Sequence, residues 1–363
     1  MDPLLPLVCL ATGTALPLTA LFLLVRRGMR QLQVAETYIE VARRLGLAAD
    51  TRGLSLQGHM DDRRLWIGEV MVGHGPQRQL VTWGVVDLLR PLGLGIMFRR
   101  RGLSERLFRR SRAPEIDFDD PELARALEVR GDDRARVRAL LTPAVRDALR
   151  ALMARWPDVV VTDDSVRVHL KHPEPDRRRL EDLVDAMLLL CERLEQARRD
   201  VDPPERLGSV TRTWQPMLDR LGLSLEPWLP AAAGEPDGRR LVLAPRRVAR
   251  GYEAELRLFF RPHPQMGLRL RTQVEPDGYW SVGQDIPTGD ARFDAAFVVK
   301  GWDPGRVRGM LSGDARASLL ALGEQGSVEM DDHALLVRGL PLDGDALEPL
   351  VVEALKLADA LGW

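Results

Sequence analysis

Apolar positions recur along this chain with two periods, and each period predicts a different kind of element. From Tyr252 to Phe260 apolar and charged residues alternate, which is the pattern of a strand with one buried face. From Leu180 to Leu194 apolar residues return every three or four positions, as on an amphipathic helix. The same criteria predict strands at 54–57, 65–72, 80–88, 94–98, 127–130, 159–161, 166–170, 240–243 and 267–272, a hairpin at 328–337, and helices at 31–47, 134–141 and 347–361.

One stretch of this pattern occurs twice. The segment 120–152 aligns without a gap with 290–322, and the match includes polar residues and a glycine as well as apolar ones. Asp120 matches Asp290, Gly131 matches Gly301, and Asp133 matches Asp303. Chance similarity between helices would preserve only their apolar residues, so we infer an internal duplication. Runs of strands followed by helices then predict an α+β protein with two tandem copies of a mostly antiparallel sheet-plus-helices domain, at 31–199 and 211–363, joined by a linker at 200–210.

The N-terminal stretch 3–25 carries no charge and is long enough to cross a bilayer as a helix. A cleaved signal peptide is the alternative, but a basic segment before the stretch and a small-x-small site after it are both missing. We therefore expect one N-terminal transmembrane helix. Arg26, Arg27 and Arg30 follow it directly, so the positive-inside rule predicts a single-pass inner-membrane protein with cytoplasmic C-terminal domains.

Charge and cysteine content narrow the picture further. The net charge of −1 conceals a balance of +8 over residues 1–112 and −9 over residues 113–363. The positive end is therefore the end next to the predicted span. The chain has only two cysteines, Cys9 and Cys191, which cannot build a disulfide framework or a cysteine-based metal site.

The common catalytic and cofactor motifs do not occur in the sequence, which favours a non-catalytic protein without a cofactor. There is no P-loop, no GxSxG, no HExxH and no strand–GxGxxG–helix unit. His169 and His172, with Glu174 and Asp176 nearby, could be interpreted as a metal cluster. An exposed turn before Pro173 explains them better, because zinc sites need three or four converging ligands. We predict no metal site.

The repeated block contributes the candidate ligand residues. Acidic and basic side chains recur at equivalent positions and could bind an anion or another small ligand between the copies. The competing interpretation is structural, because an Asp that precedes a helix commonly caps it. The candidates for ligand or anion binding are Asp132, Asp133, Arg136, Arg138, Asp303, Arg306 and Arg308.

A basic stretch at 99–112 is the strongest interaction signal. It holds seven arginines against one glutamate, together with a short apolar stripe. Such a stretch can lie on anionic lipid or bind nucleic acid, or it can be a solvated loop. The predicted anchor favours lipid and makes nucleic acid the weaker alternative. The candidates for membrane-surface contact are Arg26, Arg27, Arg30, Arg99, Arg100, Arg101, Arg109 and Arg110.

The second copy of the block resembles a pattern in uncharacterised bacterial membrane-anchored proteins. In those domains of unknown function an F-D-x-x-F-x-V strand precedes a helix and an L-L-x-P segment. Phe293, Asp294, Phe297 and Val299 match the first part, and 140–143 of the first copy match the second. The first copy departs from the pattern at Leu123 and Leu127, which stand in place of the phenylalanines. The resemblance implies membrane association and no known activity, so it contributes no site residues.

These observations predict a membrane-anchored protein whose duplicated cytoplasmic domain binds a lipid or an unknown protein partner. The alternative is a ligand-binding or hydrolytic domain with its site between the two copies. Convergence of Asp132, Asp133, Arg136 and their second-copy counterparts in one cleft would support that alternative.

Overall fold

A computed structural model describes residues 29, 32–50, 54–72, 79–102, 113–226, 231–249, 251–261, 266–273 and 285–362. The predicted span at 3–25 lies outside this part of the chain, as do Arg26, Arg27, Arg30, Arg109 and Arg110. Among the helices within it, none is both long and apolar enough to cross a membrane.

Two eight-stranded antiparallel sheets form the centre of the molecule, and they have the same strand order. The first sheet runs β1 (Ala48–Asp50), β2 (Ser55–Met60), β3 (Arg63–Val72), β4 (Gln79–Asp87), β8 (Ser165–Leu170), β7 (Val159–Thr162), β5 (Met97–Arg100) and β6 (Leu127–Arg130). The second runs β9 (Ser224–Leu225), β10 (Ala232–Gly234), β11 (Leu241–Val248), β12 (Gly251–Phe259), β16 (Ala334–Leu340), β15 (Ser327–Asp331), β13 (Arg269–Thr272) and β14 (Phe297–Lys300). The identical order agrees with the predicted duplication, and it confirms the expected α+β class with antiparallel sheets.

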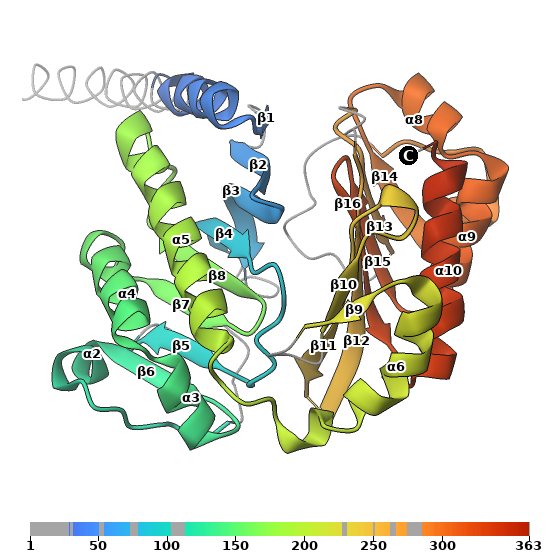
Figure 1. Ribbon diagram of the computed structural model, residues 1–363. Coiled ribbons are helices and arrows are strands. Elements are labelled where there is room, and N and C mark those ends of the chain that lie inside the picture. The colour runs from blue at the N-terminus through green and yellow to red at the C-terminus, as the bar shows by residue number, and fades with distance from the viewer. Residues whose placement is uncertain are drawn as a thin grey trace, which may run out of the picture.

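Helices cover only the outer face of each sheet, so the two inner faces are turned toward each other (Figure 1). The first sheet carries a helix over residues 32–45, then α2 (Pro121–Ala126), α3 (Arg134–Leu140), α4 (Pro143–Arg155) and α5 (Arg177–Arg198). The second carries α6 (Val210–Leu221), α7 (Ala291–Ala296), α8 (Pro304–Met310), α9 (Gly313–Gln325) and α10 (Gly344–Ala360). A separate apolar core lies between each sheet and its own helices. The result is a four-layer arrangement of helices, sheet, sheet and helices, in which the two sheets face each other.

The repeated block folds into the same short elements in both copies. Asp133 caps α3 by accepting a hydrogen bond from the Arg136 N–H, and Asp303 caps α8 by accepting from the N–H groups of Gly305 and Arg306. Gly131 and Gly301 precede these caps, and a Cβ at either position would lie 2.5 Å or 2.7 Å from the valine of the following helix. The polar and glycine matches in the block therefore reflect capping and close packing.

Several predicted boundaries differ from the observed ones. The strand expected at 94–98 begins only at Met97 and continues through Arg100, so the basic stretch starts inside a strand. The predicted linker contains a single 3-10 turn, η3 (Glu205–Leu207). The short strands β1, β9 and β10 have only two or three residues each, too few for alternation to reveal them.

Candidate functional site

A cavity of about 580 Å³ lies between the inner faces of the two sheets. Its lining residues come from the first copy at 46–87 and 164–167 and from the second copy at 246–271, 302 and 329–338. We call it the intersheet cavity. Its volume falls within the range of small-molecule sites in proteins.

The first wall of the intersheet cavity is one row of residues that crosses five strands. In neighbouring strands Ala48 lies opposite Gln57, Gln57 opposite Trp66, Trp66 opposite Val85, and Val85 opposite Arg167. Directly opposed residues of antiparallel strands point to the same face. Their sequence neighbours Leu65, Val86, Val166 and Val168 belong to the core on the other face, so this row points inward.

In the second wall, too, alternate residues of each strand point to the helix-side core and to the cavity. On β13, Leu270 is fully buried in the helix-side core, which turns Arg269 and Arg271 to the inner face. On β15, Val328 and Met330 are buried in that core, which turns Glu329 to the inner face. The intersheet cavity is therefore lined by six arginines and five carboxylates together with apolar side chains.

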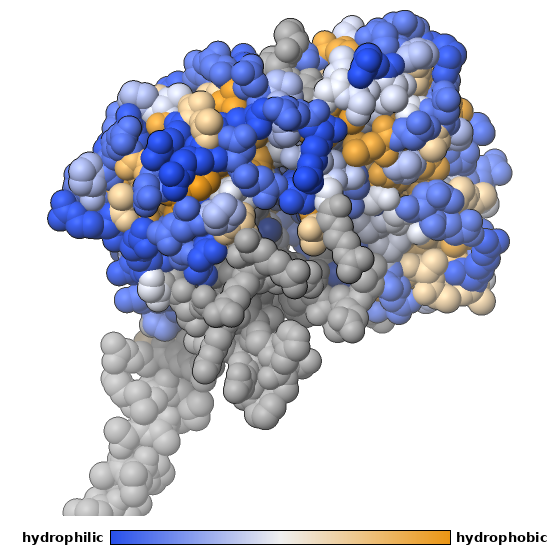
Figure 2. All heavy atoms as spheres, turned by 90° about the horizontal axis from the view of Figure 1, so that it is seen from below, coloured by the Kyte–Doolittle hydropathy of each residue, from blue (hydrophilic) through white to orange (hydrophobic). Residues whose placement is uncertain are grey.

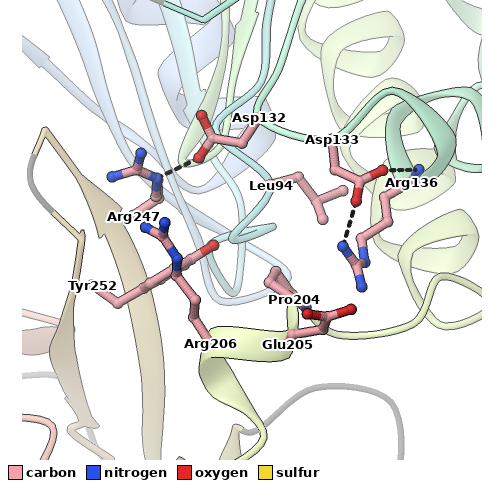
Figure 3. A pocket seen from close by; sticks show the side chains of 9 residues that line it. All are labelled: Leu94, Asp132, Asp133, Arg136, Pro204, Glu205, Arg206, Arg247 and Tyr252. Atoms are coloured by element: carbon pink, nitrogen blue, oxygen red, sulfur yellow. Dashed lines mark hydrogen bonds and ion pairs between the residues drawn. The ribbon is translucent and has the colours of Figure 1, made fainter.

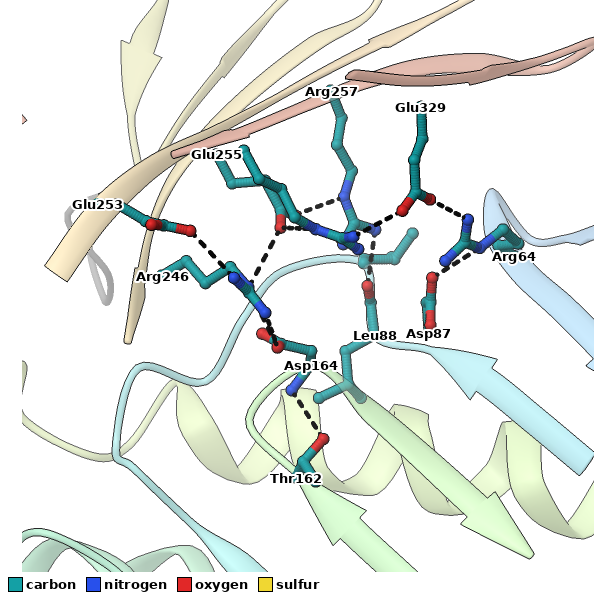
Figure 4. A network of polar contacts seen from close by, with 12 residues as sticks. Arg64, Asp87, Leu88, Thr162, Asp164, Arg246, Glu253, Glu255, Arg257 and Glu329 are labelled. Carbon is teal, nitrogen blue, oxygen red and sulfur yellow. Dashed lines mark hydrogen bonds and ion pairs between the residues drawn. The ribbon is translucent and has the colours of Figure 1, made fainter. Parts of the chain in front are cut away.

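Ion pairs between the two copies run along one side of the intersheet cavity (Figure 4). Arg64 of β3 donates to Asp87 at 2.9 Å in its own sheet and to Glu329 of the second sheet at 2.5 Å. Glu329 also accepts from Arg338 at 3.1 Å. Burial alone would raise the pKa of Glu329, but the charges of Arg64 and Arg338 outweigh it and hold that pKa at about 2. The carboxylate is therefore ionised at neutral pH and links the two copies.

A second group of charges continues the network toward the β7–β8 turn. Arg246 donates to Asp164 of the first copy at 2.9 Å and to Glu253 at 3.0 Å. Arg257 donates to the main-chain oxygen of Leu88 at 2.8 Å. The interface between the copies is thus held by charged and polar contacts as well as by packing.

The rim of the cavity carries a large exposed apolar side chain. Trp302 is 67% exposed and lies against Gly267, where a Cβ would come within 2.4 Å of the indole ring. Gly267 also has φ +62°, a conformation that favours glycine. Asp332 fixes this loop, because its carboxylate accepts hydrogen bonds from the main-chain N–H groups of Gly267 and Leu268.

Three of the four predicted ligand residues of the first copy line a different pocket. This pocket of about 420 Å³ brings Asp132, Asp133 and Arg136 together with Arg247 and Tyr252 of the second copy (Figure 3). Asp132 accepts from Arg247 at 2.5 Å, and Asp133 accepts from Arg136 at 2.5 Å. Both carboxylates are engaged in holding protein groups.

The remaining predicted ligand residues are elsewhere. Arg138 donates to the main-chain oxygen of Asp117, and Arg308 donates to that of Pro304. Asp303 caps α8, on which Arg306 and Arg308 also lie. Figure 1 places α8 at the opposite end of the molecule from α3. The convergence of the two sets in one cleft, which the sequence suggested as a test, does not occur.

Three arginines of the predicted membrane-contact set are described. Arg99 is 8% exposed and its Nε donates to Glu128 at 2.7 Å, so its guanidinium is held inside the fold. The Arg100 and Arg101 side chains are about half exposed and pair with Asp158 and Glu115. The face in Figure 2 is mainly hydrophilic where described residues show, with apolar residues in small groups.

In the described part of the chain no three His, Cys, Asp or Glu side chains are placed to hold a metal ion. His169 is one of the two histidines of the possible metal cluster, and its Nδ1 lies 3.6 Å from the Oδ2 of Asp158.

Sequence reasoning missed the residues of the intersheet cavity. The available signal was the identity of the strand residues that point away from the helix-side core, where Arg64, Trp66 and Arg167 alternate with core residues. Outward positions on a solvated sheet are polar as well, so the pattern alone does not reveal that two such faces meet.

Comparisons with known proteins give little further information. No family model matches the chain, and no curated protein matches it. The chain is similar to the crystal structure of the mycobacterial trehalose monomycolate transport factor A, TtfA, at 9% sequence identity and a TM-score of 0.34. That match covers 44% of this chain and 94% of that chain. A likeness this distant assigns no function to the present chain.

Proposed function

We propose that this chain is a non-catalytic binding protein whose two copies together form one ligand site, anchored in the inner membrane by residues 3–25 with both copies on the cytoplasmic side. The observation that carries the proposal is the intersheet cavity, because each copy supplies one of its walls. A separated copy would have only half of the site.

The arginines and Glu329 in the intersheet cavity favour binding over proton transfer. Guanidinium groups stay protonated at physiological pH, so the six arginines hold anions and cannot act as bases. General acid–base catalysis works best with a pKa near the working pH. The pKa of Glu329, at about 2, is far from that range.

The test fills the cavity with a side chain. Ala48 lies on the wall at an edge strand, so Ala48→Trp places an indole inside with little disturbance of the core. Full-length protein is purified from native membranes after carbonate washing, which tests the anchor, and is then examined by native mass spectrometry. We expect wild type to retain an added small-molecule mass and Ala48→Trp to lose most of it.

Ala151→Trp is the matched control, because Ala151 is exposed on α4, away from the cavity. It should retain the mass as wild type does. If wild type carries no added mass, or if folded Ala48→Trp carries as much as wild type, the proposal is wrong. Val85→Phe provides a second filling variant from the same wall if Ala48→Trp does not fold. The same purification would also reveal a protein partner.

A further inference from the structure

Polarity changes in one direction along the first wall of the intersheet cavity. The row starts at the sheet edge with Ala48, continues through Gln57, Trp66 and Val85, and reaches a positive charge at Arg167 in the middle of the sheet. A ligand lying along this row would meet neutral and apolar groups at one end and a guanidinium at the other.

Arg167 differs from three other arginines of the intersheet cavity. Arg64, Arg246 and Arg338 each pair with carboxylates. Arg167 donates its Nε to the Ser165 hydroxyl at 2.9 Å, and within the described residues no carboxylate pairs with it. An acidic group of a ligand would therefore find a charge-assisted hydrogen-bond donor at Arg167.

The other end of the cavity offers apolar surface next to Arg269. Leu47 and Trp66 line it from the first copy, and Leu268 and Trp302 line it from the second. A 67% exposed indole has apolar area that a ligand would remove from water. Gly267 supports this role, because its lack of a side chain leaves room for the Trp302 ring to pack against the main chain.

The apolar end faces the side of the chain that leads to the predicted span. Leu47 and Ala48 follow directly after the helix over residues 32–45, and Figure 1 places that helix, β1 and α8 at the same end of the molecule. We infer that the intersheet cavity binds a single-chain anionic amphiphile, with its acidic group at Arg167 and its apolar chain between Trp66 and Trp302. This inference rests on the proposed function and names the ligand class for the same site.

The test uses the full-length chain in phosphatidylcholine nanodiscs. A brominated fatty acid is titrated in, and quenching of tryptophan fluorescence is measured; residues 3–25 contain no tryptophan. We expect saturable quenching whose amplitude falls in Trp66→Phe. Arg167→Gln should raise the Kd about tenfold or more, because it removes a charged hydrogen bond. Arg167→Lys should recover part of the affinity, and Arg212→Gln on the exposed face of α6 should match wild type.

The methyl ester of the same brominated acid provides a test on wild type that needs no variant. It should bind much more weakly than the acid, since it lacks the charge. Equal binding of ester and acid, or an unchanged Kd in folded Arg167→Gln, would overturn the inference. A brominated lysophosphatidate distinguishes a phosphate from a carboxylate headgroup, and tight binding of either supports the inference. If the mass retained in the native experiment proves neutral and the acid does not bind, the proposed function stands and only this inference fails.

Discussion

At the scale of single residues, one buried carboxylate has the same task in both copies. Asp163 accepts hydrogen bonds from the main-chain N–H groups of Leu94, Gly95 and Ile96, as Asp332 does from Gly267 and Leu268. Asp163 fixes the loop that leads into β5, and Asp332 fixes the loop that leads into β13. These two buried aspartates of equivalent turns therefore act as structural clamps.

Asp163 gives stability an unusual dependence on pH. Burial, aided by the charge of Asp164, raises the pKa of Asp163 to about 7 despite the three N–H donors. The folded chain thus holds this proton more tightly than the unfolded chain, so ionisation between about pH 4 and 7 lowers the free energy of unfolding. Asp163→Asn cannot ionise. The difference in free energy of unfolding between wild type and Asp163→Asn should therefore shrink by more than about 1 kcal/mol as pH rises from about 4 to 7. Urea unfolding at several pH values measures it.

The control for this prediction is Asp117→Asn, at a side chain that is 86% exposed. Its difference from wild type should stay nearly constant across the same pH range. A constant difference for Asp163→Asn as well would mean that the N–H donors cancel the effect of burial.

At the scale of elements, the helix caps decide between the two interpretations of the repeated block. Asp303 Oδ1 accepts from the N–H groups of Gly305 and Arg306, both at 3.0 Å. If capping is its task, Asp303→Ala should lower the free energy of unfolding by about 1 kcal/mol, while Asp303→Asn should change it by a few tenths. Urea unfolding of both variants measures this. Loss of the retained small-molecule mass in Asp303→Asn at unchanged stability would instead favour a ligand role.

The elements that sequence predicted correctly are those with several periods of apolar residues. Helix α5, strand β12 and the β15–β16 hairpin are examples, since each presents a regular stripe to the core. Strands β9 and β10 were missed because two or three residues cannot display a period. The candidate site was missed for another reason. Arg167 and Trp66 look like solvated outward positions until the second sheet covers them, and no local pattern records that contact.

At the scale of the whole molecule, the two halves have separate apolar cores and meet through a charged interface. Besides the network at Glu329, Asp62 pairs with both Arg240 and Arg261, and Arg90 pairs with Glu226. Interfaces of this polar kind commonly permit relative motion of domains. Opening along it would expose the intersheet cavity without disturbing either core, which gives an amphiphile a way in.

Glu329 provides the test of this interface. Glu329→Gln leaves Arg64 and Arg338 with one fewer buried counter-charge, so we expect a loss of about 1–3 kcal/mol in the free energy of unfolding at pH 7, with faster hydrogen exchange in β3 and β16. Glu324→Gln, which breaks an exposed pair with Arg292, should cost less than about 1 kcal/mol. Because the pKa of Glu329 is lowered to about 2, its contribution is present above about pH 4.5 and disappears as pH falls toward 2. Wild type and Glu329→Gln should therefore converge in acid. If they remain separated there, the glutamate acts through packing rather than through its charge.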